Sequence, residues 1–283
     1  MMKARNAAAS IRARLKQHAD ARKQDFNLTL THYGLERLLY RLSISPHAQG
    51  YMLKGALLFS LWYDQPHRPT RDADLLGFGP DDVESAVSAF REICQIPVAD
   101  GIVFDLASVH GAVIRKEAGY GGVRVDIRAT LDGARIALQV DIGFGDAVTP
   151  AAQAVLYPVL LDDLPAPRLC SYPKYTVVAE KLHAICLLGM ANTRMKDYFD
   201  LWVLMQEDSL DSDELRRAIA ATFERRKLAV PSAVPAGLGE GFSGDAMKRA
   251  QWAAFLRKNR LEAAELAHVV EGLRGRFQRL GMF

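Results

Sequence analysis

The segment "RPTRDADLLGFG" contains the residues of this sequence best suited to chemistry, two carboxylates one position apart. Asp72 and Asp74 lie between an apolar helix-like run and an apolar strand-like run. In a strand, residues i and i+2 project from the same face, about 6 to 7 Å apart, so both carboxylates can approach one cation. Oxygen-only ligands favour Mg²⁺ or Mn²⁺ over zinc. A pair of this kind by itself is also a common exposed strand edge.

A third carboxylate is placed by the segment "GVRVDIRATLDGARIALQVDIGFGD". Asp132-Gly133 predicts a two-residue hairpin turn, because both central positions must adopt positive φ. The register that this turn sets collects the apolar side chains of both strands on one face and puts Arg124 beside Asp141 on the other. Asp141 is therefore either the third member of an acidic site or only the ion-pair partner of Arg124.

Clustered carboxylates repel one another unless a divalent metal neutralises them. Two such ions about 3.5 to 4 Å apart stabilise the attacking and leaving oxygens of phosphoryl chemistry. Upstream of the acidic pair, Gly55 offers a backbone without a side chain that phosphate can approach. The alternative for Gly55-Ala56 is close helix packing. The order glycine turn, apolar helix, paired carboxylates and third carboxylate is more specific than any one of its parts.

The elements that must position these residues follow from the hydrophobic periodicity. We expect helices over residues 7–19, 31–42, 54–63 and 81–94, and strands over residues 71–78 and 102–114. Thr31 is the expected N-cap of the second helix. Beyond Pro150 the chain is expected to be helical, with one helix in "KYTVVAEKLHAICLLGM" and another from "MKDYFDLWVLM". Residues 229–244 are expected to form a loop or linker before a closing helical segment with Trp252 and Phe255.

The bulk composition is that of a globular protein with a real core, with 283 residues that are 49% hydrophobic and 24% charged. No apolar run reaches the roughly 18 residues of a bilayer span, and the N-terminus lacks the apolar region of a secretory signal. We therefore expect a cytoplasmic protein with no membrane contact. Cys94, Cys170 and Cys186 lie far apart, which favours buried, reduced thiols over a zinc site or disulfides.

The net charge is only +3, but both ends of the chain are basic. The N-terminal cations are Lys3, Arg5, Arg12, Arg14, Lys16, Arg22 and Lys23. The C-terminal cations are Lys248, Arg249, Arg257, Lys258, Arg260, Arg274, Arg276 and Arg279. A polyanionic partner such as RNA would account for these clusters, since Lys and Arg bind phosphates with counterion release. A solvated helix face accounts for them equally well.

In combination, the motifs resemble the nucleotidyltransferase superfamily related to polymerase β, and more narrowly the AbiEii family of bacterial toxins. The resemblance covers roughly residues 30–205 and rests on "YMLKGALLFSLW", "RPTRDADLL", "VDIGFGD", "YPKYTVVAEKLHAI" and "TRMKDYFDLW", in the family's order. It implies an α+β fold, with a mixed, mostly antiparallel sheet flanked by helices. We expect a nucleotidyltransferase domain over residues 1–165, and a helical C-terminal domain over residues 166–283 that contributes Lys and Asp to the site.

Carried over by position, the resemblance implies that Asp72 and Asp74 hold the Mg²⁺ or Mn²⁺ ions that bind a nucleoside triphosphate (NTP), with Asp141 as the third metal ligand. Lys181 is similar to the family's lysine that meets the nucleotide phosphates, where it would offset developing charge. The other residues implied at the NTP site are Lys54, Gly55, Ala56, Arg71, Lys196, Asp197 and Asp200. The family often has Gly-Gly or Gly-Ser where this chain has Gly55-Ala56, and the Ala56 amide remains a donor.

Without the resemblance, the helical residues have simpler explanations. Lys181 would be an exposed helix lysine. Asp197 and Asp200 would pair with Arg194 or Lys196 on the same helix.

The implied activity is transfer of a nucleoside monophosphate from an NTP to an acceptor hydroxyl, with pyrophosphate leaving. Family membership would make the chain the toxin of a toxin–antitoxin or abortive-infection system for phage defence, restrained by a cognate antitoxin, with a tRNA 3′ end as acceptor. Two alternatives remain open. The same chemistry could act on a protein or a small molecule, or the chain could be a non-catalytic nucleotide- or RNA-binding protein of the same fold.

Overall fold

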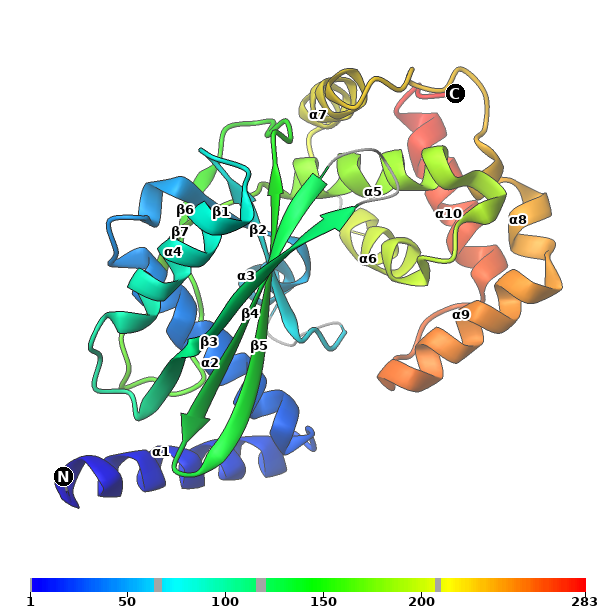
Figure 1. The fold of residues 1–283 in the computed structure, drawn as a ribbon. Coiled ribbons are helices and arrows are strands. Elements are labelled where there is room, and N and C mark those ends of the chain that lie inside the picture. Colours follow the sequence, from blue (N-terminus) through cyan, green and yellow to red (C-terminus); the bar gives the residue numbers. More distant parts are fainter. Residues whose placement is uncertain (1, 64–67, 116–120, 207–209) are drawn as a thin grey trace. The chain divides into compact units, whose positions relative to one another are not determined.

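The computed structural model describes residues 2–63, 68–115, 121–206 and 210–283 (Figure 1). The chain forms two compact units. The first contains Met1–Gly145 and Gln153–Ser171, and the second contains Asp146–Ala152 and Tyr172–Phe283. The side chains of Lys3 and Arg5, which belong to the basic N-terminal segment, lie outside the part of the chain that is described.

The first unit combines a sheet with four α-helices among its described residues. The helices are α1 (Met2–Ala21), α2 (Phe26–Ser43), α3 (Phe59–Trp62) and α4 (Val83–Gln95), with 3-10 turns η1 (Ala48–Gly50) and η2 (Gly55–Leu58). The strands are β1 (Tyr51–Lys54), β2 (Asp72–Gly77), β3 (Ile102–Arg115), β4 (Gly121–Leu131), β5 (Ala134–Phe144), β6 (Gln153–Leu156) and β7 (Arg168–Ser171).

Within the described residues the sheet has seven strands in the order β3-β4-β5-β2-β1-β7-β6. The β2–β5 and β1–β7 pairs are parallel, and the other neighbours are antiparallel. The expected mixed, mostly antiparallel sheet flanked by helices is confirmed. Its long β3–β4–β5 ribbon ends at the Asp132-Gly133 turn, which α1 approaches (Figure 1).

The hairpin register follows the expectation, with Ile127 opposite Leu138 and Arg124 opposite Asp141. The apolar face of the hairpin is core, where Val125 and Ile127 are almost fully buried. Helix α2 covers this face closely, because a Cβ added to Gly34 would lie 2.8 Å from Leu138 Cδ2. Burial of the apolar face leaves the opposite face of the sheet for polar side chains.

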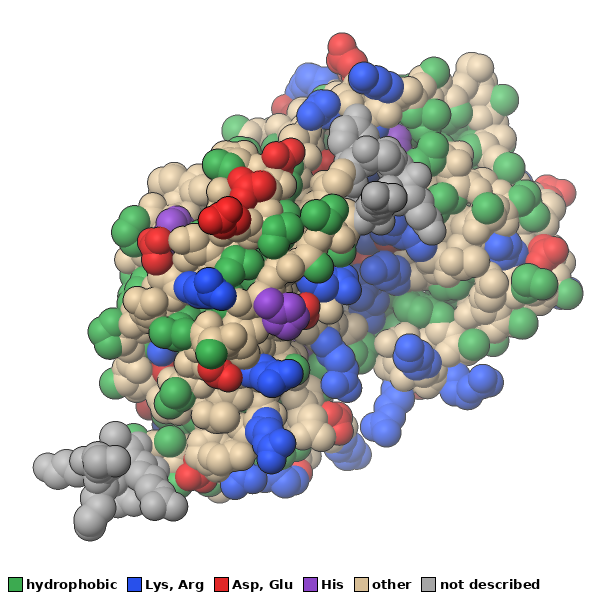
Figure 2. Space-filling model, in the orientation of Figure 1, with side chains coloured by type: hydrophobic (Ala, Val, Ile, Leu, Met, Phe, Trp, Pro, Cys, Tyr) green, Lys and Arg blue, Asp and Glu red, His purple; other side chains and the backbone are tan. Residues whose placement is uncertain are grey.

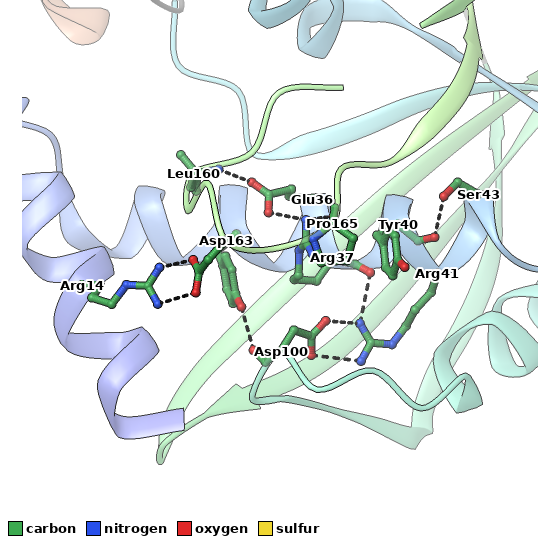
Figure 3. Close-up of polar contacts among 11 residues, drawn as sticks. Arg14, Glu36, Arg37, Tyr40, Arg41, Ser43, Asp100, Leu160, Asp163 and Pro165 are labelled. Atoms are coloured by element: carbon green, nitrogen blue, oxygen red, sulfur yellow. Dashed lines mark hydrogen bonds and ion pairs between the residues drawn. The ribbon is translucent and has the colours of Figure 1, made fainter. Parts of the chain in front are cut away.

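Buried arginines on α2 fix the loops around it (Figure 3). The guanidinium of Arg41 donates to both carboxylate oxygens of Asp100, and both side chains are buried. Arg37 is fully buried, pairs with Glu36 at 2.6 Å and donates to the Pro165 carbonyl oxygen at 3.0 Å. Desolvation raises the pKa of Glu36 to about 7, although Arg37 opposes that shift. These contacts attach two loops of the first unit to one helix.

The second unit is helical among its described residues. Its elements are α5 (Lys174–Leu188), η3 (Gly189–Ala191), α6 (Met195–Met205), α7 (Ser212–Arg225), η4 (Ala236–Leu238), α8 (Glu240–Gly244), α9 (Ala246–Asn259) and α10 (Leu266–Arg279). Arg226, after α7, donates to Asp146 at 2.9 Å and to Glu180 at 2.7 Å. The segment that follows β5 is thereby attached to the helices of this unit. None of the described helices combines the length and hydropathy that a bilayer crossing requires.

Several expected elements differ from the structure. Helix α2 begins at the N-cap Asp25, so Thr31 lies inside the helix, where its hydroxyl donates to the Asn27 carbonyl oxygen. Lys54 ends a strand instead of beginning a helix, and η2 and α3 follow it. The helical expectation beyond Pro150 missed β6 and β7, whose four-residue length gives little periodicity. The expected linker at residues 229–244 contains η4 and α8.

Replacing Asp100 with Asn should leave the buried guanidinium of Arg41 without its carboxylate. We expect the free energy of unfolding to fall by about 3 to 5 kcal/mol, because an unpaired buried charge is costly. Urea denaturation monitored by circular dichroism measures the change. The control is Asp163→Asn, which removes the carboxylate from the exposed Arg14–Asp163 pair and should shift the urea midpoint far less. Equal shifts for the two variants would contradict a structural role for the buried pair.

Candidate active site

The predicted carboxylates of the first unit are brought together on one face of the sheet by strand register. Asp74 lies opposite Lys54 on β1 and opposite Asp141 on β5, and Asp141 lies opposite Arg124 on β4. Directly opposite residues of neighbouring strands share a face. Four neighbouring strands therefore present a row in which two carboxylates stand between two cations. Asp72, two residues before Asp74, lies on the same face opposite Gln139.

Gly55 packs directly against the carboxylate of Asp74. A Cβ built at Gly55 would lie 2.1 Å from Asp74 Oδ2 and 2.7 Å from its Cβ. The backbone of Gly55 also has a φ of 73°, a value that residues other than glycine rarely adopt. Glycine is required here because of both the backbone conformation and the place of the Asp74 side chain.

Asp72 is oriented by a residue that sequence analysis did not single out. The Thr70 hydroxyl donates to Asp72 Oδ1 at 2.7 Å, and the Thr70 carbonyl oxygen accepts from His32 Nε2 at 2.7 Å. Burial lowers the pKa of His32, which favours the neutral ring. Its proton lies on Nε2, because the partner there is a carbonyl oxygen, which can only accept. The sequence could have predicted the role of Thr70, because its hydroxyl lies only two residues before the carboxylate of Asp72. His32 gave none, because it lies on a different element, 38 residues earlier.

Asp141 forms a two-point ion pair with Arg124 in this structure. Arg124 Nε and Nη2 donate to the two carboxylate oxygens, each at 2.8 Å. These hydrogen bonds raise the pKa of the Arg124 guanidinium, so it stays charged. The ion-pair explanation for Asp141 is thus what the geometry presents. As a metal ligand Asp141 would have to exchange this partner for the ion.

The site residues predicted on helices, Lys181, Asp197 and Asp200, contact one another in the second unit. Lys181 Nζ lies 3.1 Å from Asp197 Oδ1 and 2.7 Å from Asp200 Oδ2. Arg194 Nε lies 2.7 Å from the other oxygen of Asp197. Both carboxylates are almost fully buried, and the Lys181 side chain is only 12% exposed. Lys181 is therefore not an exposed helix lysine.

The remaining predicted site residues are Ala56, Arg71 and Lys196. Ala56 is half-buried in η2, and Arg71, just before β2, is exposed. Lys196 is exposed on α6, and within the described ranges neither Arg71 nor Lys196 forms an ion pair. In the same ranges no group of three or more His, Cys, Asp or Glu side chains has the arrangement of a metal site. The hard oxygen donors of the carboxylates suit Mg²⁺, although Asp141 is already held by Arg124.

One protein-family profile matches residues 37–272 of this chain, and its description is "Nucleotidyl transferase AbiEii toxin, Type IV TA system". The match spans most of both units. The chain belongs to the AbiEii family. It is accordingly a nucleotidyltransferase of a type IV toxin–antitoxin family, which implies an NTP substrate and an antitoxin partner. The polymerase β-like resemblance of its motifs is consistent with this assignment.

Two solved structures from Helicobacter pylori have a similar chain course. The protein JHP933 is 15% identical, with a TM-score of 0.48 over 86% of this chain and 87% of that one. A second protein, named as a candidate nucleotidyltransferase, is 16% identical, with a TM-score of 0.49 over 86% of this chain and 90% of that one. No curated protein matches this AbiEii chain significantly.

Replacing Gly55 with Ala should displace the Asp74 carboxylate and reduce the rate of nucleotide transfer by about 100-fold, since small misplacements of reacting groups are costly. The matched control is Gly133→Ala. Gly133 has a similar φ of 77°, but its added Cβ meets no atom within 4 Å. Both variants carry the backbone strain, and only Gly55→Ala carries the clash. A similar loss of transfer rate in both variants would show that contact with Asp74 is irrelevant.

Replacing Lys181 with Met should leave two buried carboxylates without their shared ammonium group. We expect the free energy of unfolding to fall by about 3 kcal/mol or more, measured by urea denaturation. Lys196→Met removes a lysine from an exposed position of α6 and should change stability little. If Lys181→Met were as stable as Lys196→Met, Lys181 would not act as the counter-ion of Asp197 and Asp200.

Proposed function

We propose that this AbiEii chain transfers a nucleoside monophosphate from an NTP to the 3′-terminal hydroxyl of a tRNA, with Mg²⁺ or Mn²⁺ held by Asp72 and Asp74. The observation that carries the proposal is the row Lys54, Asp74, Asp141 and Arg124 across four neighbouring strands. Two carboxylates that can hold a divalent cation stand there between two cations that can meet phosphate oxygens. A metal-bound triphosphate has this same pairing of charges.

The side chains of the row have separable roles in this proposal. Thr70 orients the carboxylate of Asp72, and the backbone of Gly55 limits the position of Asp74. Asp141 holds Arg124 charged and directed along the sheet face, where the guanidinium can bind phosphate oxygens. Transfer of Arg124 to a phosphate would free Asp141 to accept the proton of the acceptor hydroxyl or to join the metal ligands.

The metal, when bound, supplies neutralisation of the triphosphate and of the charge that develops on the leaving pyrophosphate. The protein contributes position, because in-line attack on the α-phosphate demands little covalent chemistry of the side chains. Support for a polyanionic acceptor is the concentration of cations at both ends of the sequence. The cytoplasmic location follows from an RNA acceptor and is part of the proposal.

The test incubates the purified chain with each labelled NTP and Mg²⁺, together with total tRNA or total protein. We expect the label on tRNA, its loss on chelation by EDTA, and its return with Mg²⁺ or Mn²⁺. Asp72→Asn and Asp74→Asn should each lower incorporation by about 100-fold or more, since both carboxylates act in the transition state. The control Asp81→Asn changes an exposed carboxylate just beyond β2 and should leave incorporation unchanged.

The outcomes separate the parts of the proposal. Full incorporation by Asp72→Asn or Asp74→Asn would refute the assigned metal ligands. Label on protein or on a small molecule would refute the tRNA acceptor while leaving the transfer chemistry in place. Growth arrest on expression of the wild-type chain, relieved in the same two variants, would connect the transfer to toxicity.

A further inference from the structure

Some cations of the basic C-terminal end contact other side chains or carbonyl oxygens of the second unit, and others are exposed. Lys248 is buried, donates to the Asn192 carbonyl oxygen at 2.8 Å and lies over the Phe242 ring. Arg274 lies 3.5 Å from Glu240. Both of these cations contribute to the internal structure of the second unit. They are not available to a partner in the same way as an exposed side chain.

Four other cations on or beside α9 remain exposed. Arg249, Arg257 and Lys258 lie on the helix, and Arg260 is its C-cap. Among the described residues, no carboxylate forms an ion pair with any of the four, and α9 itself contains no Asp or Glu. Figure 2 shows Lys and Arg side chains gathered over the end of α9, which the reader can locate from the same orientation in Figure 1.

Two of these cations share one face of the helix, and Lys258 and Arg260 lie at its C-terminal end. Arg249 and Arg257 are eight residues apart, with the exposed Ala253 midway, and such i, i+4, i+8 positions share a face. At a rise of about 1.5 Å per residue, Arg249 and Arg257 are about 12 Å apart along the helix axis. The exposed residues between Arg249 and Arg257 are alanines, so an extended phosphate backbone can approach the helix closely.

Two simpler explanations account for less of this surface. Cations in the last turn stabilise the helix dipole, but Arg249 lies near the N-terminal end, where a cation has the opposite effect. A membrane-binding helix needs large apolar side chains on its exposed face. Here Met247 is the strongly exposed large apolar side chain of α9, whereas Trp252 is almost fully buried and its Nε1 donates to the Ala264 carbonyl oxygen.

Three cations of the basic N-terminal segment differ from those of α9. Arg14 donates to Asp163, Lys16 pairs with Asp20, and Arg12 lies 3.8 Å from Asp132. Each of these exposed cations already has a carboxylate beside it. The two basic ends were equivalent in sequence, and their surroundings distinguish them.

We propose that the exposed cations on and beside α9, Arg249, Arg257, Lys258 and Arg260, bind the phosphate backbone of the RNA acceptor. This inference rests on the proposed function for the identity of the RNA, and it assigns acceptor binding to the second unit. The contact is with phosphates, so it is independent of base sequence.

The test measures binding of total tRNA to the full chain without NTP or metal, over a series of salt concentrations. The triple variant Arg249→Gln/Arg257→Gln/Lys258→Gln should bind about tenfold more weakly near physiological salt, with a salt slope smaller by about 2, since each lost phosphate contact removes roughly 0.7 to 0.9 from the slope. The matched control Arg12→Gln/Arg14→Gln/Lys16→Gln removes the same charge from α1 and should retain most of the binding. Melting by circular dichroism verifies that both variants are folded.

A charge-preserving variant separates the loss of charge from other effects of substitution. Arg249→Lys/Arg257→Lys should retain the salt slope, because the contact is electrostatic. Equal binding by the α9 triple variant and the wild type would overturn the proposal, as would equal loss in the α1 control. Binding of phosphatidylglycerol vesicles in preference to tRNA would also overturn it, by assigning the surface to lipid.

Failure of this inference and failure of the proposed function are distinguishable. Asp72→Asn should bind tRNA like the wild type, because binding is measured without the reaction. If the α9 variant transfers nucleotide and binds tRNA normally, the inference fails and the function stands. If tRNA binding depends on α9 but the wild type never incorporates label, the function fails and the surface assignment stands.

Discussion

The parallel pairing of β2 with β5 is the constraint on which the candidate site depends. It places Asp74 directly beside Asp141, although the two residues belong to strands separated by a helix and two other strands. The antiparallel partners on either side then supply Lys54 and Arg124. A shift of either strand by one residue would turn the carboxylates into the core, where their apolar neighbours now lie. The same burial that forms the core therefore selects the register that forms the site.

Both sets of predicted acidic residues are accompanied by cations from their own unit. Arg124 holds Asp141, and Lys181 holds Asp197 and Asp200. Like charges so close together are unfavourable unless an opposite charge is near. In the proposed chemistry Arg124 has two alternative partners, a carboxylate and a phosphate, and exchange between them would couple substrate binding to the availability of Asp141. Lys181 is more enclosed, because its side chain is only 12% exposed and lies between two buried carboxylates.

The scaffold behind the sheet is fixed by buried ion pairs as well as by apolar packing. Arg41 and Asp100 are paired in the interior of the first unit, and Arg37 joins Glu36 to the Pro165 carbonyl oxygen. Such pairs contribute little net stability over apolar contacts, but breaking one leaves a charge without compensation. They restrict the loops around α2 to one arrangement, and the α2 residue His32 meets Thr70, the residue that orients Asp72.

The sequence alone determined the hairpin, its register and the face on which Asp141 lies, because Asp132-Gly133 specifies a tight turn and strand periodicity specifies the rest. Its motif order also determined the family. The short strands β6 and β7 could not be predicted, because four residues show little hydrophobic periodicity and their conformation depends on pairing within the sheet. Only the tertiary structure decided that Gly55 packs on Asp74 and that His32 and Thr70 support Asp72. It also decided that, among the described residues, the exposed cations on and beside α9 form no ion pair with a carboxylate. Each of these depends on residues distant in sequence, whose proximity is set by packing and not by any local pattern.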